Sequence, residues 1–371
     1  MTTIQVYKYN DDMKMIMRWF GTGYDSVTLQ QIRQVPGLRG VAATLYGKRP
    51  GEVWEKEAIL AMKKEVEDAG LSIAAVESVN IHDTIKTGAP ERDKYIDNYI
   101  TTLGRLGEAG LDLVCYNFMT IFDWTRSDLA KLREDGATAM SYDQKIIDKI
   151  DPDDMSTAMQ AQSNGFALAG WEPERLGHLK ELFALYHDID EEKLFANLKY
   201  FLERIMPVCA QYGIRMAMHP DDPAWSVFGL PRIQTRKEQL LRLTKLVDHP
   251  CNGITLCTGS LGTNPANDIP DIIRSLKDRI YFAHIRNLRH NGLGVFEECA
   301  HLSADGSMDM FAIVKALHDT GFDGPIRPDH GRAIWGEVSM PGYGLFDRAL
   351  GASYLNGLWE AVEKSSLCVS H

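Results

Sequence analysis

The sequence predicts an α/β protein in which residues 1–371 form a single (β/α)8 TIM barrel. Eight short apolar runs are spread along the chain, and each is followed by a segment with helical periodicity. Alternating strands and helices indicate a parallel sheet, and eight repeats indicate a sheet closed into a barrel. A doubly wound open sheet is the alternative, but no GxGxxG pattern follows the first predicted strand.

The predicted strands are short, apolar segments bounded by polar residues and glycines. They cover residues 15–21, 40–45, 71–79, 111–117, 214–219, 254–260, 281–287 and 324–330. Four of them follow a helix that ends at glycine, namely Gly70, Gly110, Gly213 and Gly321. Glycine adopts the left-handed conformation of a helix C-cap at little cost, so this repeated joint supports alternating helices and strands.

Between the strands, apolar residues recur at spacings of three and four, which is typical of helices that pack one face against a sheet. Residues 54–68 are a clear example, with Ile59, Met62 and Val66 on one face. The helix that ends before Gly213 contains Pro207, where we expect a kink. Further helices are predicted over 26–35, 237–247, 268–277, 309–319 and 346–363.

One interval is too long for an ordinary barrel connection. Roughly a hundred residues separate the fourth strand, which ends near Asn117, from the fifth, which starts near Ile214. Residues 123–188 are polar, rich in Asp, Ser and Met, and contain helical patches. We therefore expect a helical cap inserted between strands four and five, acting either as a lid over the active site or as a surface decoration without function.

Charge and cysteine content narrow the possible functions. The net charge of −11 argues against a non-specific nucleic-acid binder, which needs a basic surface. No apolar run approaches the roughly 18 residues of a membrane span, and the polar N-terminus lacks the apolar segment of a secretory signal. The six cysteines form no CxxC pair, so we expect reduced thiols in a cytoplasmic protein. We expect a small-molecule substrate and a homo-oligomer, in the simplest case a dimer.

Candidate metal ligands stand at the ends of four consecutive predicted strands. They are His219 in MHPDDP, Cys257 in ITLCTGS, His284 in YFAHIRN and Asp329 in IRPDHGR. In a barrel of this kind, the carboxyl ends of the strands surround one active-site basin. Imidazole, thiolate and carboxylate together suit a divalent transition-metal ion such as Mn²⁺, Fe²⁺ or Zn²⁺. Each residue alone has a structural explanation, and only their recurrence predicts a metal site.

Two further residues near the last strand are candidate acid/base groups. His330 directly follows Asp329, which we count among the catalytic residues as well as the ligands. Tyr343 lies between two glycines in MPGYGLF, a setting that allows close backbone approach and leaves the phenol exposed. A turn tyrosine that covers the rim of the barrel is the alternative.

Candidate substrate-binding residues follow the same strand ends. Arg286 and Arg332 lie shortly after predicted ligands, and an arginine there can bind a carboxylate through two parallel hydrogen bonds. His82 follows the third predicted strand and Asn117 ends the fourth. Surface ion pairing for the arginines and an ordinary loop position for His82 are the alternatives.

Taken together, these motifs resemble the bacterial D-mannonate dehydratase family, which acts in hexuronate breakdown. The resemblance rests on RWFG, VCYNF, MHPDDP, CTGSLG, HIRN, RPDHGR and PGYG, and it runs from about Met15 to Glu363. Residues 130–190 follow the family loosely. The resemblance implies a metal-dependent barrel related to sugar isomerases, which usually uses Mn²⁺, with Fe²⁺ possible and Zn²⁺ less favoured.

The resemblance also implies residue roles and a reaction. It assigns the metal to His219, Cys257, His284 and Asp329, and acid/base chemistry to His330 and Tyr343. The implied reaction is the dehydration of D-mannonate to 2-keto-3-deoxy-D-gluconate and water in glucuronate catabolism. The rival functions are a sugar isomerase on the same barrel, a non-catalytic protein with structural zinc, and a metal phosphodiesterase acting on DNA. The acidic net charge counts against the last of these.

Overall fold

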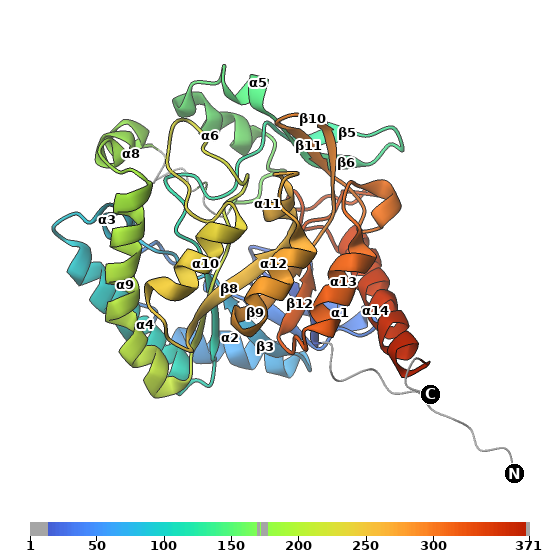
Figure 1. The fold of residues 1–371 in the computed structure, drawn as a ribbon, viewed down its shortest axis with the longest axis horizontal. Coiled ribbons are helices and arrows are strands. Elements are labelled where there is room, and N and C mark those ends of the chain that lie inside the picture. The colour runs from blue at the N-terminus through green and yellow to red at the C-terminus, as the bar shows by residue number, and fades with distance from the viewer. Residues whose placement is uncertain (1–13, 169–170, 172–176, 369–371) are drawn as a thin grey trace, which may run out of the picture.

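The computed structural model describes residues 14–168, 171 and 177–368 and contains the predicted closed barrel (Figure 1). The eight barrel strands are all parallel and follow the order β1-β12-β9-β8-β7-β4-β3-β2 around the barrel. Their bounds are β1 (Lys14–Arg18), β2 (Gly40–Ala43), β3 (Ser72–Glu77), β4 (Leu113–Tyr116), β7 (Arg215–Met218), β8 (Asn252–Cys257), β9 (Ile280–Ile285) and β12 (Pro325–Pro328).

Helices surround the barrel, and α4 and α9 lie side by side along one flank (Figure 1). The helices are α1 (Leu29–Gln34), α2 (Lys56–Asp68), α3 (Asp83–Thr87), α4 (Arg92–Glu108), α5 (Gln144–Ile147), α6 (Pro152–Ala161), α8 (Leu179–Tyr186), α9 (Glu191–Tyr212), α10 (Lys237–Leu246), α11 (Thr258–Gly262), α12 (Ile269–Leu276), α13 (Met310–Asp319) and α14 (Leu345–Cys368). The predicted face of α2 is buried, and α9 continues through Pro207. The predicted periodicity therefore identified helices that pack against the sheet.

The register of the sheet places residues of three strands next to one another at the carboxyl end of the barrel. Cys257 of β8 pairs in register with His284 of β9, and His284 pairs with Arg327 of β12. Because parallel strands end on the same side of a barrel, the side chains at these positions reach a common region. The register thus fixes the location of the site.

The cap differs from the helical insertion that the sequence suggested. Residues 123–188 contain α5, α6 and α8, but also the strands β5 (Asp128–Leu132) and β6 (Thr138–Asp143). These strands join β10 (Leu288–Gly292) and β11 (Val295–Glu298) in an antiparallel sheet of order β10-β11-β6-β5, at the top of Figure 1. The predicted insertion therefore contains helices, but its two strands were not predicted. Residues 169–170 and 172–176 of this segment lie outside the described residues.

The cap has an apolar core of its own. Tyr142 of β6 stacks on Phe296 of β11 with ring centroids 5.3 Å apart, and Phe122 stacks on Trp171 at 5.1 Å. This cluster also includes Phe20, which follows β1, so it reaches the carboxyl end of the barrel. Aromatic pairs of this kind bury large areas in defined geometries. The cap is therefore packed onto the barrel rather than loosely attached.

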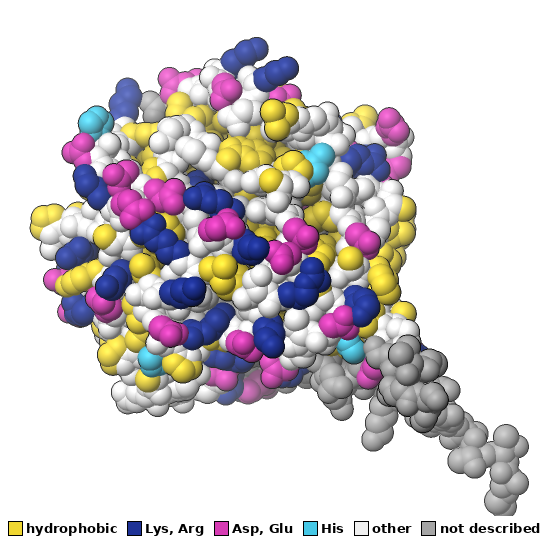
Figure 2. All heavy atoms as spheres, in the orientation of Figure 1, with side chains coloured by type: hydrophobic (Ala, Val, Ile, Leu, Met, Phe, Trp, Pro, Cys, Tyr) yellow, Lys and Arg dark blue, Asp and Glu magenta, His cyan; other side chains and the backbone are white. Residues whose placement is uncertain are grey.

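The surface in Figure 2 carries basic and acidic side chains interspersed over the same face. The net charge of −11 is thus not gathered into one acidic patch on this face. Among the described residues, no helix is both long enough and apolar enough to cross a lipid bilayer.

Candidate metal centre and active site

Three of the four predicted metal ligands converge at the carboxyl end of the barrel. His219 directly follows β7, Cys257 ends β8, and His284 lies near the end of β9. One ligand atom from each of these side chains lies within 4.8 Å of the other two. Cys257 and His284 are completely buried, and His219 is partly exposed. This spacing allows all three atoms to contact a single ion.

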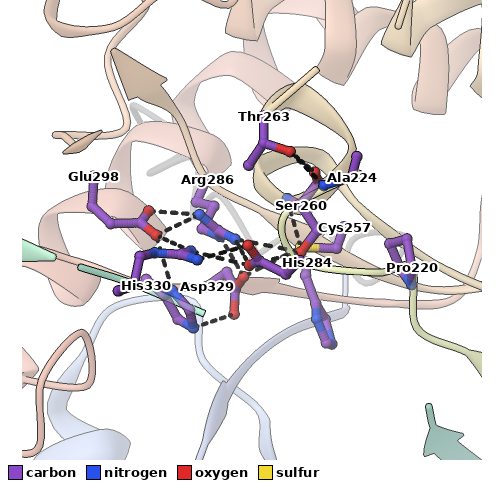
Figure 3. A network of polar contacts seen from close by, with 12 residues as sticks. Pro220, Ala224, Cys257, Ser260, Thr263, His284, Arg286, Glu298, Asp329 and His330 are labelled. Carbon is purple, nitrogen blue, oxygen red and sulfur yellow. Dashed lines mark hydrogen bonds and ion pairs between the residues drawn. The ribbon is translucent and has the colours of Figure 1, made fainter. Parts of the chain in front are cut away.

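Asp329, the fourth predicted ligand, directly follows β12 and lies beside this group (Figure 3). Its Oδ2 is 3.4 Å from Cys257 Sγ and accepts a hydrogen bond of 2.7 Å from Arg286 Nε. Its Oδ1 lies 2.6 Å from Arg327 Nη1. Although burial opposes ionisation, Arg327 and other nearby cations hold the pKa of Asp329 well below its ordinary value. The carboxylate is therefore charged, but an ion must share it with two arginines.

The hydrogen bond of His219 suits a metal ligand, whereas the contacts of His284 would have to change for it to bind an ion. His219 Nδ1 donates to the carbonyl of Pro220 at 2.7 Å, which leaves Nε2 with a free lone pair. Such a hydrogen bond to a backbone carbonyl commonly orients a metal-binding imidazole. His284 Nε2 is buried, has no hydrogen-bond partner among the described residues, and lies 3.4 Å from Glu77 Oε2. Because Arg327 Nη2 is 3.2 Å from His284 Nδ1, an ion bound by His284 would replace one of these contacts.

A second group of possible ligands shares His284. Glu77 and Cys115 each offer one atom within 4.8 Å of the other and of His284. Burial raises the pKa of Cys115 well above its ordinary value, so the thiol stays protonated and is a poor ligand. Arg327 already pairs with Glu77 Oε1 at 2.8 Å. The group of His219, Cys257 and His284 is therefore the better candidate for a metal ion.

The predicted acid/base residues touch each other. His330 Nε2 lies 3.1 Å from the hydroxyl of Tyr343, and His330 Nδ1 lies 3.3 Å from Glu298 Oε1. An ionised carboxylate only accepts hydrogen bonds, so Nδ1 carries a proton, and in the neutral imidazole Nε2 accepts from the phenol. Burial raises the pKa of Tyr343, and the nearby Arg327 offsets this only in part. The three residues thus form a chain of hydrogen bonds from Tyr343 to Glu298.

A buried network of opposite charges supports this chain (Figure 3). Arg286 lies 2.7 Å from Asp222 and 2.6 Å from Glu298. Arg126, from the cap segment, contacts the same two carboxylates at 2.7 Å each. Although burial disfavours its charged form, the two arginines lower the pKa of Glu298 to about 2. Paired charges of this kind hold His330 and Asp329 in fixed positions.

A cavity opens onto the site, and one of the four predicted substrate-binding residues lines it. Asn117 lines the cavity together with His219, Asp329, His330 and Tyr343. Its side chain donates to Asp123 at 3.1 Å.

Arg286, Arg332 and His82 do not line this cavity. Arg286 is fully buried among carboxylates, and Arg332 pairs with Asp347 at 2.9 Å and with Asp135 at 2.8 Å. His82 caps the start of α3 and stacks on another ring with centroids 3.7 Å apart. The two arginines therefore have carboxylate partners within the protein, which leaves them poorly placed to bind a substrate carboxylate.

Several residues of the site were missed by reasoning from the sequence. Arg18 ends β1, Glu77 ends β3 and Arg327 lies on β12, so the strand-end rule that identified the ligands could have found them. Glu298 gave no such signal, because it belongs to the cap sheet and reaches His330 only through pairing with distant strands.

Polar and titratable side chains gathered in a cavity at the carboxyl end of a closed (β/α)8 barrel define a barrel enzyme. The sequence model of the D-mannonate dehydratase (UxuA) family matches residues 13–368. The chain thus belongs to the D-mannonate dehydratase family, whose members are hydro-lyases.

Individual relatives agree with this assignment. The chain is 67% identical over 352 residues to a mannonate dehydratase of Brachyspira hyodysenteriae, a match that covers 95% of this chain and 99% of that one. Among solved structures, it resembles the mannonate dehydratase of Streptococcus suis serotype 2 with a TM-score of 0.86 and 43% identity, over 95% and 96% of the two chains. A xylose isomerase domain protein of Planctomyces limnophilus, at 12% identity and a TM-score of 0.54 over 95% and 98% of the two chains, shares only the fold.

Proposed function

We propose that this protein catalyses the dehydration of D-mannonate to 2-keto-3-deoxy-D-gluconate and water in glucuronate catabolism. The observation that carries the proposal is the family match over residues 13–368. The relatives that share most of this chain's length are named mannonate dehydratases. The paired His330 and Tyr343 in the cavity support a reaction that moves protons.

The difficult step is removal of the proton at C2 of the substrate. The neighbouring carboxylate is already negative, so the developing enolate-like species carries additional negative charge. A divalent ion held by His219, Cys257, His284 and Asp329 would stabilise that charge electrostatically. We propose Mn²⁺ with Fe²⁺ as the alternative, because four protein ligands would close a tetrahedral zinc site and leave no position for substrate.

We assign the base to His330 and the acid to Tyr343. Glu298 keeps the proton of His330 on Nδ1, so Nε2 can accept the proton from C2 once the phenol of Tyr343 turns from His330 to the substrate. The raised pKa of Tyr343 keeps its phenol protonated, and the phenol protonates the C3 hydroxyl as the C3–O bond breaks. The products are water and an enol with a C2–C3 double bond, which tautomerises to the 2-keto acid.

The function is tested by removing bound metal with a chelator, restoring single ions and assaying D-mannonate for 2-keto acid formation. We expect product with Mn²⁺ and less product with Zn²⁺. Absence of product with every ion would overturn the proposed reaction. Interconversion of an aldose and a ketose in the same preparation would favour a sugar isomerase instead.

We also propose that the enzyme is cytoplasmic and forms a homo-oligomer, in the simplest case a dimer. Cys115, Cys209, Cys251, Cys257 and Cys299 are free thiols, which suits a reducing compartment. Sedimentation of the purified protein tests the oligomeric state, and a single species with the 41.7 kDa mass of one chain would contradict it.

A further inference from the structure

Arg18 is a buried cation at the active-site cavity without a carboxylate partner. It ends β1, is 4% exposed and lines the cavity together with His330 and Tyr343. Among the described residues, no carboxylate lies within ion-pair distance of its guanidinium. Arg327, the other arginine that lines this cavity, has carboxylate partners, so Arg18 differs from it.

The contacts of Arg18 hold the guanidinium in place without neutralising it. Its Nη1 donates to the carbonyls of Ala42 at 3.0 Å and Trp19 at 3.2 Å. Its central carbon lies 4.2 Å from the centroid of the Phe20 ring, at cation–π distance. No hydrogen bond to Nε or Nη2 is made by the described residues. Burial lowers the pKa of Arg18, as expected for a charge without a close counter-ion.

A buried, unpaired charge is costly for a folded protein. The cost is understandable if an anion supplies the missing partner when it binds. Two donors on one edge of a guanidinium match the two oxygens of a carboxylate, which is the strongest pairing available to arginine. The vacant Nε and Nη2 of Arg18 are such an edge.

The position of Arg18 suits the reacting end of the substrate. The Phe20 ring beneath Arg18 packs edge-on against Tyr343 at 4.8 Å, and the hydroxyl of Tyr343 lies 3.1 Å from His330 Nε2. A carboxylate bound at Arg18 would therefore have its adjacent carbon near the acid/base pair. Arg18 also lines a second cavity, together with Thr44, Lys48 and Asn80. These residues offer polar groups to the hydroxyl groups of the sugar-acid substrate.

The geometry points to Arg18 as the residue that binds the carboxylate of the sugar-acid substrate, in place of Arg286 and Arg332. This inference rests on the proposed function. It adds that Arg18 makes the enzyme select a sugar acid over a neutral sugar. Glu77, Asp222 and Asp329 line the same cavity, but each of them pairs with another arginine. Asp123 also lines it and accepts a hydrogen bond from Asn117 at 3.1 Å. The anion is therefore favoured locally, at the Nε and Nη2 edge of Arg18, and not by the charge of the whole cavity.

The test compares Arg18→Met and Arg18→Lys with wild type and with Arg33→Met, which removes an exposed arginine far from the cavity. We expect Arg18→Met to raise the KM for D-mannonate about 10- to 100-fold, the loss typical of charge-assisted hydrogen bonds. Arg18→Lys keeps the charge but not the paired donors, so its KM is expected to lie between those of wild type and Arg18→Met. Arg33→Met is expected to match wild type.

A binding measurement separates recognition of charge from a structural effect. D-Gluconate and D-mannitol serve as an anionic and a neutral probe, and each is added to the enzyme while its Tm is recorded. We expect D-gluconate to raise the Tm of wild type and of Arg33→Met, and this shift to be lost in Arg18→Met. Any shift with D-mannitol is expected to be the same in all variants.

The outcomes distinguish this inference from the proposed function. If wild type does not dehydrate D-mannonate, the proposed function fails, while the shift with D-gluconate still reports on Arg18. If Arg18→Met folds and keeps both its KM and its D-gluconate shift within about twofold of wild type, the inference is overturned. If Arg18→Met does not fold, Arg18→Lys decides, and an unchanged KM in that variant overturns the inference equally.

Discussion

Cys257 shows how much a single side chain contributes to the candidate site. Its sulfur accepts hydrogen bonds from the amide and the hydroxyl of Ser260, at 3.4 and 3.0 Å, and as a thiol it donates to Asp329, just after β12, at 3.4 Å. The hydrogen bonds from Ser260 fix the position of the sulfur, which binds metal as a thiolate. The strand-end rule predicted this residue from the sequence, whereas the hydrogen bonds that prepare it depend on the fold.

Replacing Cys257 by serine tests the ligand assignment. We expect Cys257→Ser to weaken metal binding by more than about tenfold, since even changes behind a ligand cost that much. Metal content after dialysis and the rate with D-mannonate are the measurements, with Cys251→Ser as a control away from the cavity. Normal metal content together with normal activity in Cys257→Ser would show that the ligand set is wrong.

Tyr343 allows a second test on the scale of one residue. Tyr343→Phe removes the hydroxyl that contacts His330 and keeps the ring that packs against Phe20. We expect kcat to fall about 100-fold or more with little change in KM, because a proton donor is lost while binding contacts remain. Tyr142→Phe, in the cap, serves as the matched control and is expected to keep its kcat. An unchanged kcat in Tyr343→Phe would exclude the acid role.

On the scale of secondary-structure elements, the sequence predicted the barrel better than the cap. Strands such as β8 and β9 could be recognised because buried parallel strands form short, continuous apolar runs between helices. The cap strand β6 pairs with β11, which lies about 150 residues further along the chain, at Tyr142 and Phe296. Nothing local to either segment encodes that pairing, so the cap sheet required the structure.

Long-range pairing also explains why some residues of the site could be predicted from the sequence and others could not. His219, Cys257, His284 and Asp329 lie on or directly after barrel strands, where position in the sequence predicts position in space. The partners of Arg286 could not be predicted, because two of its three carboxylates belong to a loop and to the cap sheet.

Arg126 allows a test of whether the cap is part of the active site. It comes from the cap segment and pairs with Asp222 and Glu298 while fully buried. We expect Arg126→Met to lower the free energy of unfolding by about 3 kcal/mol, because two buried carboxylates lose a partner. We also expect kcat to fall, because Glu298 orients His330.

The matched control for Arg126 is Arg133, another arginine of the cap, whose side chain is 5% exposed. Arg133 pairs with the carboxylates of Glu297 and Asp305, and it contacts Glu298 only at its backbone carbonyl, at 3.0 Å. We expect Arg133→Met to lower stability and to leave kcat close to wild type. Chemical denaturation and steady-state kinetics give both quantities. Equal losses of kcat in the two variants would mean that the cap affects catalysis only through overall stability.

On the scale of the whole molecule, the buried carboxylates make the fold sensitive to acid. The pKa of Glu298 is lowered to about 2 in the folded protein, because Arg286 and Arg126 outweigh the effect of burial. In the unfolded chain a glutamate titrates near 4.3, so this group stabilises the fold fully above about pH 4.3. That contribution, about 3 kcal/mol, is lost as the pH falls towards 2.

Glu298→Gln tests this dependence on pH. We expect the free energy of unfolding of wild type to fall more steeply than that of the variant between about pH 4.5 and 2.5. Above pH 5 the two curves should run parallel, with the variant lower. Denaturant titrations at a series of pH values measure both curves. Identical slopes at low pH would contradict the lowered pKa of Glu298.

The closure of the barrel has a consequence for protein synthesis. The last barrel strand, β12, completes the ring by pairing with the first, at Lys14 and Pro325. The cavity likewise combines Arg18 and Glu77 from the early part of the chain with Asp329 and Tyr343 from the late part. On the ribosome, β1 can pair with β2 early, but its pairing with β12 must wait until residues 325–328 have been translated. The complete cavity can form only after the chain has emerged from the exit tunnel as far as Tyr343.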